Sequence, residues 1–522
     1  MHGFSEVKYH FVGSIVADEL YLCSKIFILN SYKKLAGDTV IYGMSSIVGR
    51  ILNWCLAPYY MVIFAPEDFG IMTNLYQYVA FLMILLTYGM ETSFFRYASK
   101  SDEPDKVYST AVISLFSTSV LFVIPFFFIS GFVANILQYP GHPEYILWLA
   151  IILGIDALTA IPFAQLRLKN RPVRFATIKL INIAFNIAFN LFFLSLCPYL
   201  LKNNPESIVK YIYSDEVGVG YVFIANLLAS LSTLVLLMPE MLKISFQFDQ
   251  KQLKIMLTYG GGILVVGLAG MVSQGIDKIL IPFLVPENQN PMQQLGIYGG
   301  NFKVAILMNV FIQAFRYAFE PFFFSNSSQK NDPKIYAVIM KYFVIFGLVI
   351  FLGMMLYVDL LKIIIQKDYQ EGMKAIPLIL LANLFFGIYF TLSLWYKLTD
   401  KTKLGAYVAI FGAVITVLLN VMLIPVMGYM GSAISTFLGF FIMMVVSYFL
   451  GQKYYPVPYP VKRILTYFLI AGIIYFISIY TNTFSSVLKY LINTLLLFAF
   501  FTTVFMFENS ELKSLFKINK KK

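Results

Sequence analysis

The sequence predicts an all-α membrane protein that crosses the bilayer about fourteen times. Of its 522 residues, 59% are hydrophobic and only 13% are charged, and the mean hydropathy is +0.75. A soluble core does not require this much apolar surface, and long uncharged runs recur along the whole chain. An outer-membrane β-barrel would instead show short segments of alternating polarity.

The fourteen predicted segments each have the ~20 or more residues that a bilayer requires. They span residues 38–64, 69–97, 107–137, 145–168, 173–197, 217–239, 254–285, 296–325, 335–361, 374–398, 403–424, 428–451, 463–482 and 486–507. We divide the chain into a leader (1–36), an N-lobe of helices one to six (37–240), a C-lobe of helices seven to twelve (241–455), and helices thirteen and fourteen with a basic tail (456–522).

The leader differs from the rest of the chain. It has no basic n-region and no cleavage motif, and Asp18 and Glu19 interrupt its apolar part, so it does not have the pattern of a secretory signal peptide. Two interpretations remain open: a segment lying in the membrane interface, or a start site placed too early.

Cations are unequally divided between alternate loops. One set holds seventeen: Lys100, Lys106, Arg167, Lys169, Arg171, Arg174, Lys243, Lys251, Lys254, Lys330, Lys334, Lys397, Lys401, Lys403, Lys453, Lys462 and Arg463. The other holds six: Lys202, Lys210, Lys362, Lys367, Lys374 and Lys489. The positive-inside rule places the first set, and with it both termini, in the cytoplasm.

The chain partly repeats itself at an offset of 229 to 230 residues. Glu91 aligns with Glu320 and Pro104 with Pro333 at the shorter offset, and Asn190 aligns with Asn420 at the longer one. Because each copy holds six helices, both copies enter the membrane in the same orientation, as a parallel repeat. Two such lobes around a central cleft form a transporter architecture.

Ionisable residues inside the predicted helices are the first candidates for a functional site. They are Arg50, Glu91, Arg96, Asp277, Lys278, Lys303, Arg316 and Glu320. Such residues usually face a cavity or pair with one another, so the surplus of cations predicts a positive cleft and an anionic substrate. The alternatives are that Arg316 and Glu320 neutralise each other one turn apart, and that Lys303 extends to the membrane interface.

Helix five carries a polar stripe. Lys179, Asn182, Asn186 and Asn190 fall on one helical face. One interpretation is hydrogen bonding between helices, the usual role of Asn in membranes. The other is a polar wall that binds sugar hydroxyls.

Several functional classes find little support. The three Cys and three His residues lack metal-ligand spacing, no phosphate-binding loop indicates direct use of ATP, and the net charge of +12 comes from helix ends rather than a nucleic-acid surface. Glu67 and Asp68 in the first outward loop resemble the acidic pair of membrane glycosyltransferases, but beside Pro and Gly they are more typical of a turn. We therefore expect no enzymatic activity.

Several stretches resemble the Wzx-like polysaccharide flippases of the multidrug/oligosaccharidyl-lipid/polysaccharide (MOP) exporter superfamily. They are KKLAGDTVIYGMSSIVGRILNW, GIMTNLYQYVAFLMILLTYGMETSFFRYASK, GIDKILIPFL and QAFRYAFEPFFF. The resemblance implies a bacterial inner-membrane protein that moves oligosaccharide on undecaprenyl diphosphate to the outer leaflet. It carries over to Arg50, Glu91, Arg96, Asp277, Lys278, Arg316 and Glu320, whereas Lys303 is added from its position and charge.

The predicted function is therefore export of lipid-linked oligosaccharide in surface polysaccharide (lipopolysaccharide) biosynthesis, with no cofactor but with proton or sodium coupling as an option. The expected partners are the lipid-linked oligosaccharide and membrane lipid, with a glycan polymerase and a chain-length regulator as further candidates, and no nucleic acid. The alternatives are a cation-coupled multidrug exporter on the same fold and a membrane glycosyltransferase or glycan polymerase.

Overall fold

The computed structural model describes residues 48–49, 51–244, 247–305, 307–316, 333–393, 395–396, 399 and 401–519, with side chains to residue 509. Throughout these ranges the regular structure is helical. The prediction of a polytopic all-α membrane protein is confirmed.

Twelve spans in the described ranges are long and apolar enough to cross a bilayer. The first six are Pro66–Ala98 (α2, Pro66–Thr87, and α3, Met90–Ala98), Pro104–Ile136 (α4), Pro143–Leu168 (α5), Pro172–Asn203 (α6, Pro172–Leu191, a π-helical turn and α7, Cys197–Asn203), Gly220–Met241 (α8) and Gln250–Leu284 (α9). The next four are Lys334–Leu356 (α12), Lys367–Leu392 (a 3-10 segment, Lys367–Ala375, and α14, Ile376–Leu392), Thr402–Met427 (α16) and Tyr429–Tyr454 (α17). The last two are Val461–Thr483 (α18, Val461–Tyr480, and a 3-10 turn) and Ser486–Asn509, which lies within α19 (Ser486–Asn519). A bent pair, α10 (Pro291–Val304) and Leu307–Arg316, makes a thirteenth, and Ile51–Ile63 is a shorter apolar helix.

Several predicted helices are interrupted, among them the one over 335–361, which breaks at Tyr357. The predicted helix over 69–97 breaks between α2 and α3, where Tyr88 and Gly89 have φ of 36° and 71°, a left-handed backbone that ends an α-helix. A Cβ atom on Gly89 would lie only 2.6 Å from the carbonyl oxygen of Gly260 in α9, so the break brings α3 against that helix. The predicted helix over 296–325 is bent by 50° between α10 and Leu307–Arg316.

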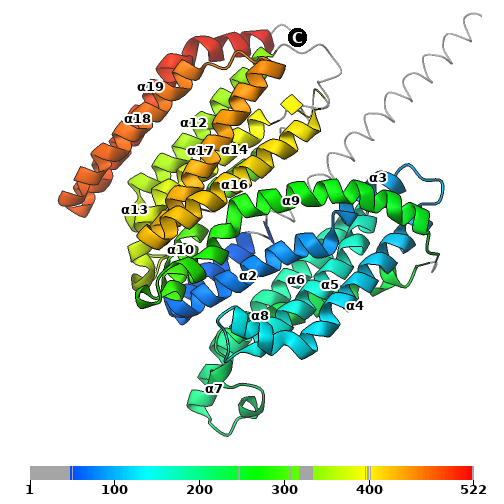
Figure 1. The fold of residues 1–522 in the computed structure, drawn as a ribbon. Coiled ribbons are helices and arrows are strands. Elements are labelled where there is room, and N and C mark those ends of the chain that lie inside the picture. Colours follow the sequence, from blue (N-terminus) through cyan, green and yellow to red (C-terminus); the bar gives the residue numbers. More distant parts are fainter. Residues whose placement is uncertain are drawn as a thin grey trace, which may run out of the picture.

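The helices form two groups. Within the N-lobe residues, α5 packs on α4 and α8, and α8 on α6. Within the C-lobe residues, α17 packs on α14 and α16, and α12 on α14, while α18 of the C-terminal hairpin packs on α12. Figure 1 shows the two groups meeting where α2, α10 and α13 (Val358–Leu361) lie together and diverging from there. We call the meeting region the joined end and the opposite region, where α3 lies, the splayed end.

At the joined end the backbones of α2 and α10 are almost in contact. A Cβ atom on Gly296 would lie 1.6 Å from the carbonyl oxygen of Pro66, and one on Gly70 would lie 2.0 Å from that of Met292. No other residue fits at these positions without moving a helix, because both obstacles are backbone atoms. Glycine at the crossing thus permits the close packing that small residues give to membrane helices.

Tyr369, in the 3-10 segment before α14, ties the C-lobe to the N-lobe at the same end. Its hydroxyl donates to the carbonyl oxygen of Phe64 at 2.9 Å, and its ring meets that of Phe69 edge-on with centroids 5.7 Å apart. Asn301 of α10 donates to the Tyr369 carbonyl oxygen at 2.8 Å. The phenol is fully buried, so this contact holds the two lobes together at the joined end.

Helix α9 connects the lobes along its length. Near the splayed end, the Ser93 hydroxyl of α3 donates to the Met256 carbonyl oxygen of α9 at 3.0 Å. In the middle of α9, Ala269 packs against Ala409 and Ala413 of α16. A helix that belongs to the C-lobe by sequence therefore also lies against the N-lobe.

The hairpin of α18 and α19 packs on α12 around a buried carboxylate. Glu508 of α19 forms an ion pair with Lys341 of α12 and accepts a hydrogen bond from the Tyr467 hydroxyl of α18. Both members of the ion pair are almost fully buried. Asn493 of α19 donates to the Leu356 carbonyl oxygen at 2.6 Å, so the hairpin is attached to α12 at both of its ends.

Gly296→Ala should destabilise the protein, because a methyl group would press directly on the backbone of α2. Overpacking of this kind costs about 1–3 kcal/mol. The measurement is the thermal unfolding midpoint of the purified protein in detergent. Gly472→Ala in α18, where a Cβ atom meets nothing within 4 Å, is the matched control; equal midpoints for the two variants would contradict the role of the α2–α10 contact.

Candidate functional site: a carboxamide-lined cavity between the lobes

A cavity of about 620 Å³ lies between the two lobes. Its described lining comes from the helix Ile51–Ile63 and from α2, α6 and α8 on one side, and from α9, α10, the helix Leu307–Arg316, α14 and α17 on the other. The polar side chains are Asn53, Trp54, Tyr60, Tyr76, Asn182, Asn186, Asn226, Gln274, Lys303, Asn309, Gln313 and Asn383, and the aromatic ones without a polar group are Phe69, Phe302, Phe386 and Phe440.

Carboxamides are the commonest polar side chains in this lining, and some of them donate hydrogen bonds from their NH2 groups to other protein atoms. Asn182 donates to the Ala229 carbonyl oxygen and to the Thr233 hydroxyl, both at 2.9 Å. Asn383 donates to the carbonyl oxygen of Ile379 at 2.8 Å. Within the described part of the chain no donor reaches the Oδ1 atom of either side chain. The cavity therefore presents amide oxygens that can accept hydrogen bonds from hydroxyl groups.

Among the described lining residues, Lys303 is the one cation. It lies at the C-terminal end of α10, its side chain is accessible from the cavity, and among the described residues no carboxylate lies within ion-pair distance of it. The Trp54 indole of the N-lobe donates to its carbonyl oxygen at 2.8 Å, which fixes the backbone of this last turn across the lobe interface. An ammonium group inside a membrane protein requires a counter-ion, so the position favours an anionic ligand.

The residues of the polar stripe of helix five lie in different surroundings. Asn182 and Asn186 line the cavity, although Asn182 also bonds to α8. Asn190 is fully buried behind them and accepts a hydrogen bond from the Tyr60 hydroxyl at 2.8 Å, as expected for bonding between helices. Lys179 lies over the ring of Phe163 at 4.1 Å from its centroid and is not in the described lining.

Asp277 and Lys278 lie outside the described lining and pair with each other. The Lys278 ammonium lies 3.1 Å from the Asp277 carboxylate, which also accepts a hydrogen bond from the Tyr298 hydroxyl at 2.7 Å. The same ammonium lies over the Phe302 ring, 4.1 Å from its centroid, and Asn74 of α2 donates to the Lys278 carbonyl oxygen at 2.7 Å. The structure therefore gives this pair a place in the packing of α2, α9 and α10.

Glu91 and Arg96 of α3 lie toward the splayed end, apart from the cavity lining. Glu91 forms an ion pair with Arg167 of α5. The Arg96 guanidinium lies over the ring of Tyr259 in α9, 4.4 Å from its centroid. Both residues thus connect α3 to neighbouring helices.

Of the three remaining predicted site residues, the structure describes only Arg316. Arg316 lies over the ring of Phe390 in α14, with 3.8 Å between the guanidinium carbon and the ring centroid, and is not in the cavity lining. Arg50 and Glu320 lie outside the described residues.

Sequence reasoning missed most of the carboxamides. Asn53, Asn226, Asn309 and Asn383 come from four different helices, and each stands alone among apolar neighbours. The available signal was the recurrence of amide side chains in predicted membrane spans, because a buried amide has the same need for a partner that draws attention to a buried charge.

The twelve candidate spans and the polar cavity between two groups of helices define the class of the protein: a polytopic, all-α membrane protein with a cavity between two helical lobes. A family model described as polysaccharide biosynthesis protein matches residues 35–327, which is more than half of the chain. The chain therefore belongs to this family.

Solved structures of low sequence identity share the fold. A structure titled "Lipid II flippase MurJ, inward closed conformation" has a TM-score of 0.67 and 16% identity, covering 91% of this chain and 100% of that one. An inward-facing multidrug resistance MATE family transporter of the MOP superfamily has a TM-score of 0.60 and 13% identity, covering 78% and 94%. A structure of the MATE multidrug transporter DinF-BH has a TM-score of 0.58 and 15% identity, covering 81% and 96%. No curated protein sequence matches the chain.

Removing one member of the buried Asp277–Lys278 pair should destabilise the protein strongly, because the other charge would remain buried without its partner, at a cost of about 3–5 kcal/mol. The double variant Asp277→Asn/Lys278→Met should recover much of that loss. Thermal unfolding midpoints of the two single variants and the double variant provide the measurement. If the double variant were less stable than both single variants, the assignment of the pair to packing would be wrong.

Proposed function

We propose that this protein moves a lipid-linked oligosaccharide, with sugars on undecaprenyl diphosphate, across the bacterial inner membrane during surface polysaccharide biosynthesis. The observation that carries the proposal is the cavity between the lobes, whose described polar lining is rich in carboxamides and contains Lys303 as its cation. Membership of the polysaccharide biosynthesis protein family supports it.

The chemistry of the cavity suits a sugar diphosphate. Sugar hydroxyl groups both donate and accept hydrogen bonds, and so do carboxamides, while the aromatic rings of Trp54 and Phe386 offer apolar surfaces to the faces of pyranose rings. Lys303 would pair with the diphosphate. Without such partners a polar headgroup in hydrocarbon would lose its water uncompensated.

The membrane orientation follows from the loop charges. The cation-rich loops, including Arg171 and Lys251, lie toward the splayed end, so we place that end in the cytoplasm with both termini. The joined end then faces outward. In this orientation the headgroup enters from the side where the lobes diverge, while the polyprenyl tail remains in lipid, and the interior-negative potential favours outward movement of an anion by ~2.3 kcal/mol per charge per 100 mV.

The alternatives are less well supported. A cation-coupled drug exporter is expected to have an acidic cleft, whereas none of the described residues lining this cavity is acidic. For the glycosyltransferase alternative, the candidate pair Glu67 and Asp68 lies in the first turn of α2. Carboxylates in that position are favoured by the helix dipole, which accounts for them without catalysis.

Deletion of the gene in its native host tests the function directly. We expect undecaprenyl-linked oligosaccharide to accumulate with its sugars on the cytoplasmic face, as measured by the inaccessibility of the glycan to an impermeant glycosidase in intact spheroplasts. Accumulation of single repeat units on the outer face would indicate a polymerase and refute the proposal.

Lys303→Gln should abolish or severely reduce export while leaving the protein folded, because it removes the cavity cation and keeps a polar side chain of similar length. Lys303→Arg should retain substantial export. Surface glycan and membrane-inserted protein are measured in the same cells, with Lys462→Gln at the start of α18 as the charge-matched control. Normal export by Lys303→Gln would show that this ammonium does not bind the substrate.

A further inference from the structure

A second cavity, of about 550 Å³, lies at the joined end of the C-lobe, between that lobe and the α18–α19 hairpin. It does not share a described lining residue with the cavity between the lobes. Its described lining is Met355, Val358, Asp359, Lys362, Gln370, Met373, Lys374, Pro377, Tyr475, Asn482, Phe484, Ser486 and Lys489.

Three lysines and one carboxylate give this lining a surplus of two positive charges. Asp359 lies between two of the lysines: its carboxylate is 2.6 Å from the Lys362 ammonium and forms a second ion pair with Lys489. Burial opposes ionisation of Asp359, but hydrogen bonds from Lys362 and Lys489 hold its pKa below the usual value. Asp359 therefore remains an anion that orients both cations.

The third lysine comes from another element and has an exposed carboxylate partner outside the lining. Lys374 belongs to the 3-10 segment before α14 and lies 3.3 Å from the carboxylate of Glu371 in an exposed pair, an arrangement worth little in water. Lys489 is largely buried and also donates to the Asn482 side chain. Cations from three separate elements therefore converge on one cavity.

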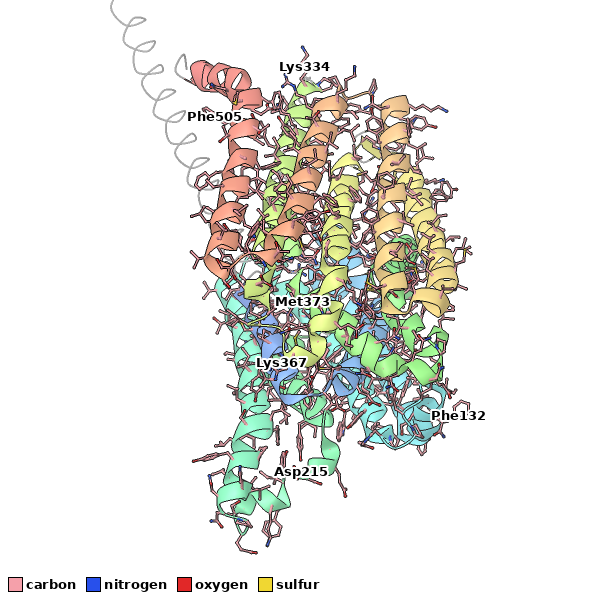
Figure 2. The ribbon with its side chains drawn as sticks, turned by 90° about the vertical axis from the view of Figure 1, so that its left-hand side faces the viewer. Phe132, Asp215, Lys334, Lys367, Met373 and Phe505 are labelled. Carbon is pink, nitrogen blue, oxygen red and sulfur yellow. The ribbon has the colours of Figure 1, made fainter. Side chains whose placement is uncertain are left out.

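This convergence is unexpected for this end of the molecule. The loops predicted to face outward hold six lysines, and three of them line this one cavity. A fourth, Lys367, begins the same 3-10 segment that carries Lys374. Figure 2 shows Lys367 and Met373 close together and far from Lys334, which marks the other end of α12. Helix packing alone does not require three of the few lysines in the outward loops to line the same cavity.

The rest of the lining suits a lipid rather than a soluble anion alone. Met355, Met373 and Tyr475 provide apolar surface beside the lysines. In the first turns of α19, which also carry the lining residues Ser486 and Lys489, Val487 and Leu491 are 79% and 54% exposed, as expected for side chains that face hydrocarbon. A phosphate at the lysines would therefore have its acyl or prenyl chain alongside α19.

We propose that this cavity binds the phosphate group of a lipid in the leaflet at the joined end, which is the outer leaflet in the orientation given above. Lys362 and Lys374 would contact the phosphate, and Lys489, held by Asp359, would support it from below. Two lipids carry this chemistry: the polyprenyl diphosphate carrier after translocation, and an anionic phospholipid. The site is separate from the cavity between the lobes and does not depend on the function assigned to that cavity.

Lysine acetylation of the full-length protein in phosphatidylcholine nanodiscs tests the proposal at the site itself. The acetylation rates of Lys362 and Lys374 are compared, by mass spectrometry of peptides, with those of Lys202 and Lys210, the two outward lysines elsewhere. The probes are inorganic diphosphate, undecaprenyl diphosphate and phosphatidylglycerol. We expect at least one probe to slow acetylation at Lys362 and Lys374 selectively.

The pattern among the probes identifies the source of the phosphate. Selective protection by undecaprenyl diphosphate, and not by phosphatidylglycerol, assigns the site to the translocated carrier, and the reverse assigns it to membrane phospholipid. Protection by inorganic diphosphate as well shows that the phosphate itself supplies the binding. If none of the three probes protects Lys362 and Lys374 more than Lys202 and Lys210, the proposal is overturned.

A variant pair adds a quantitative criterion. In Lys374→Gln, the probe concentration that half-protects Lys362 should rise about tenfold, the effect of losing one charge-assisted hydrogen bond. Lys210→Gln, which changes the net charge equally, should leave that midpoint unchanged. Equal midpoints in the two variants would also overturn the proposal, whether or not the central cavity transports a glycan.

Discussion

The structure depends on the contact between α2 and α10 at the joined end, where the two lobes approach to backbone distance. Gly70 and Gly296 make this approach possible, and Tyr369 closes it from the side of α14. Because the lobes meet so closely at one end and diverge from there (Figure 1), a cavity lined by both of them is left inside the membrane-spanning part of the protein. The position of the candidate site is thus a consequence of where glycine permits two helices to cross.

The ionisable groups within the described spans have two kinds of partner. Glu91 pairs with Arg167, Asp277 with Lys278, and Glu508 with Lys341, because an unpaired charge in this environment is costly. Arg96, Lys179 and Arg316 lie over aromatic rings instead. Lys303 differs from both groups in that it faces the cavity, and the described protein supplies it with no carboxylate. A cation without a protein counter-ion, among amide oxygens that accept hydrogen bonds, is the local arrangement that an anionic, hydroxyl-rich ligand would complete.

The all-α membrane fold was predictable because long apolar runs can be recognised from the order of residues along the chain, without knowledge of which helices touch. The aligned pair Asn190 and Asn420 both donate to the carbonyl oxygen four residues earlier and are fully buried; Asn301 and Asn383 make the same bond, so the predicted repeat stays a prediction. The candidate site was harder to predict, because it depends on which side chains meet across helices. Asp277 and Lys278 are consecutive, and consecutive residues on a helix do not normally face each other; the Tyr298 hydroxyl and the Phe302 ring hold them together.

Helix α9 constrains how the lobes can move if they alternate between inward and outward states. It contacts α16 through a small patch of alanines. Its contact with α3 combines the close backbone approach at Gly260 and Ser93 with large side chains, because the Tyr259 ring lies under Arg96 and meets the Tyr97 ring edge-on. The alanine patch lacks large interdigitated side chains, so a pivot across it need not force side chains out of their rotamers. A rocking motion would therefore meet resistance at the aromatic contact of α3 with α9, and at Tyr369 beside the α2–α10 crossing, where a buried hydrogen bond must break before the joined end can open.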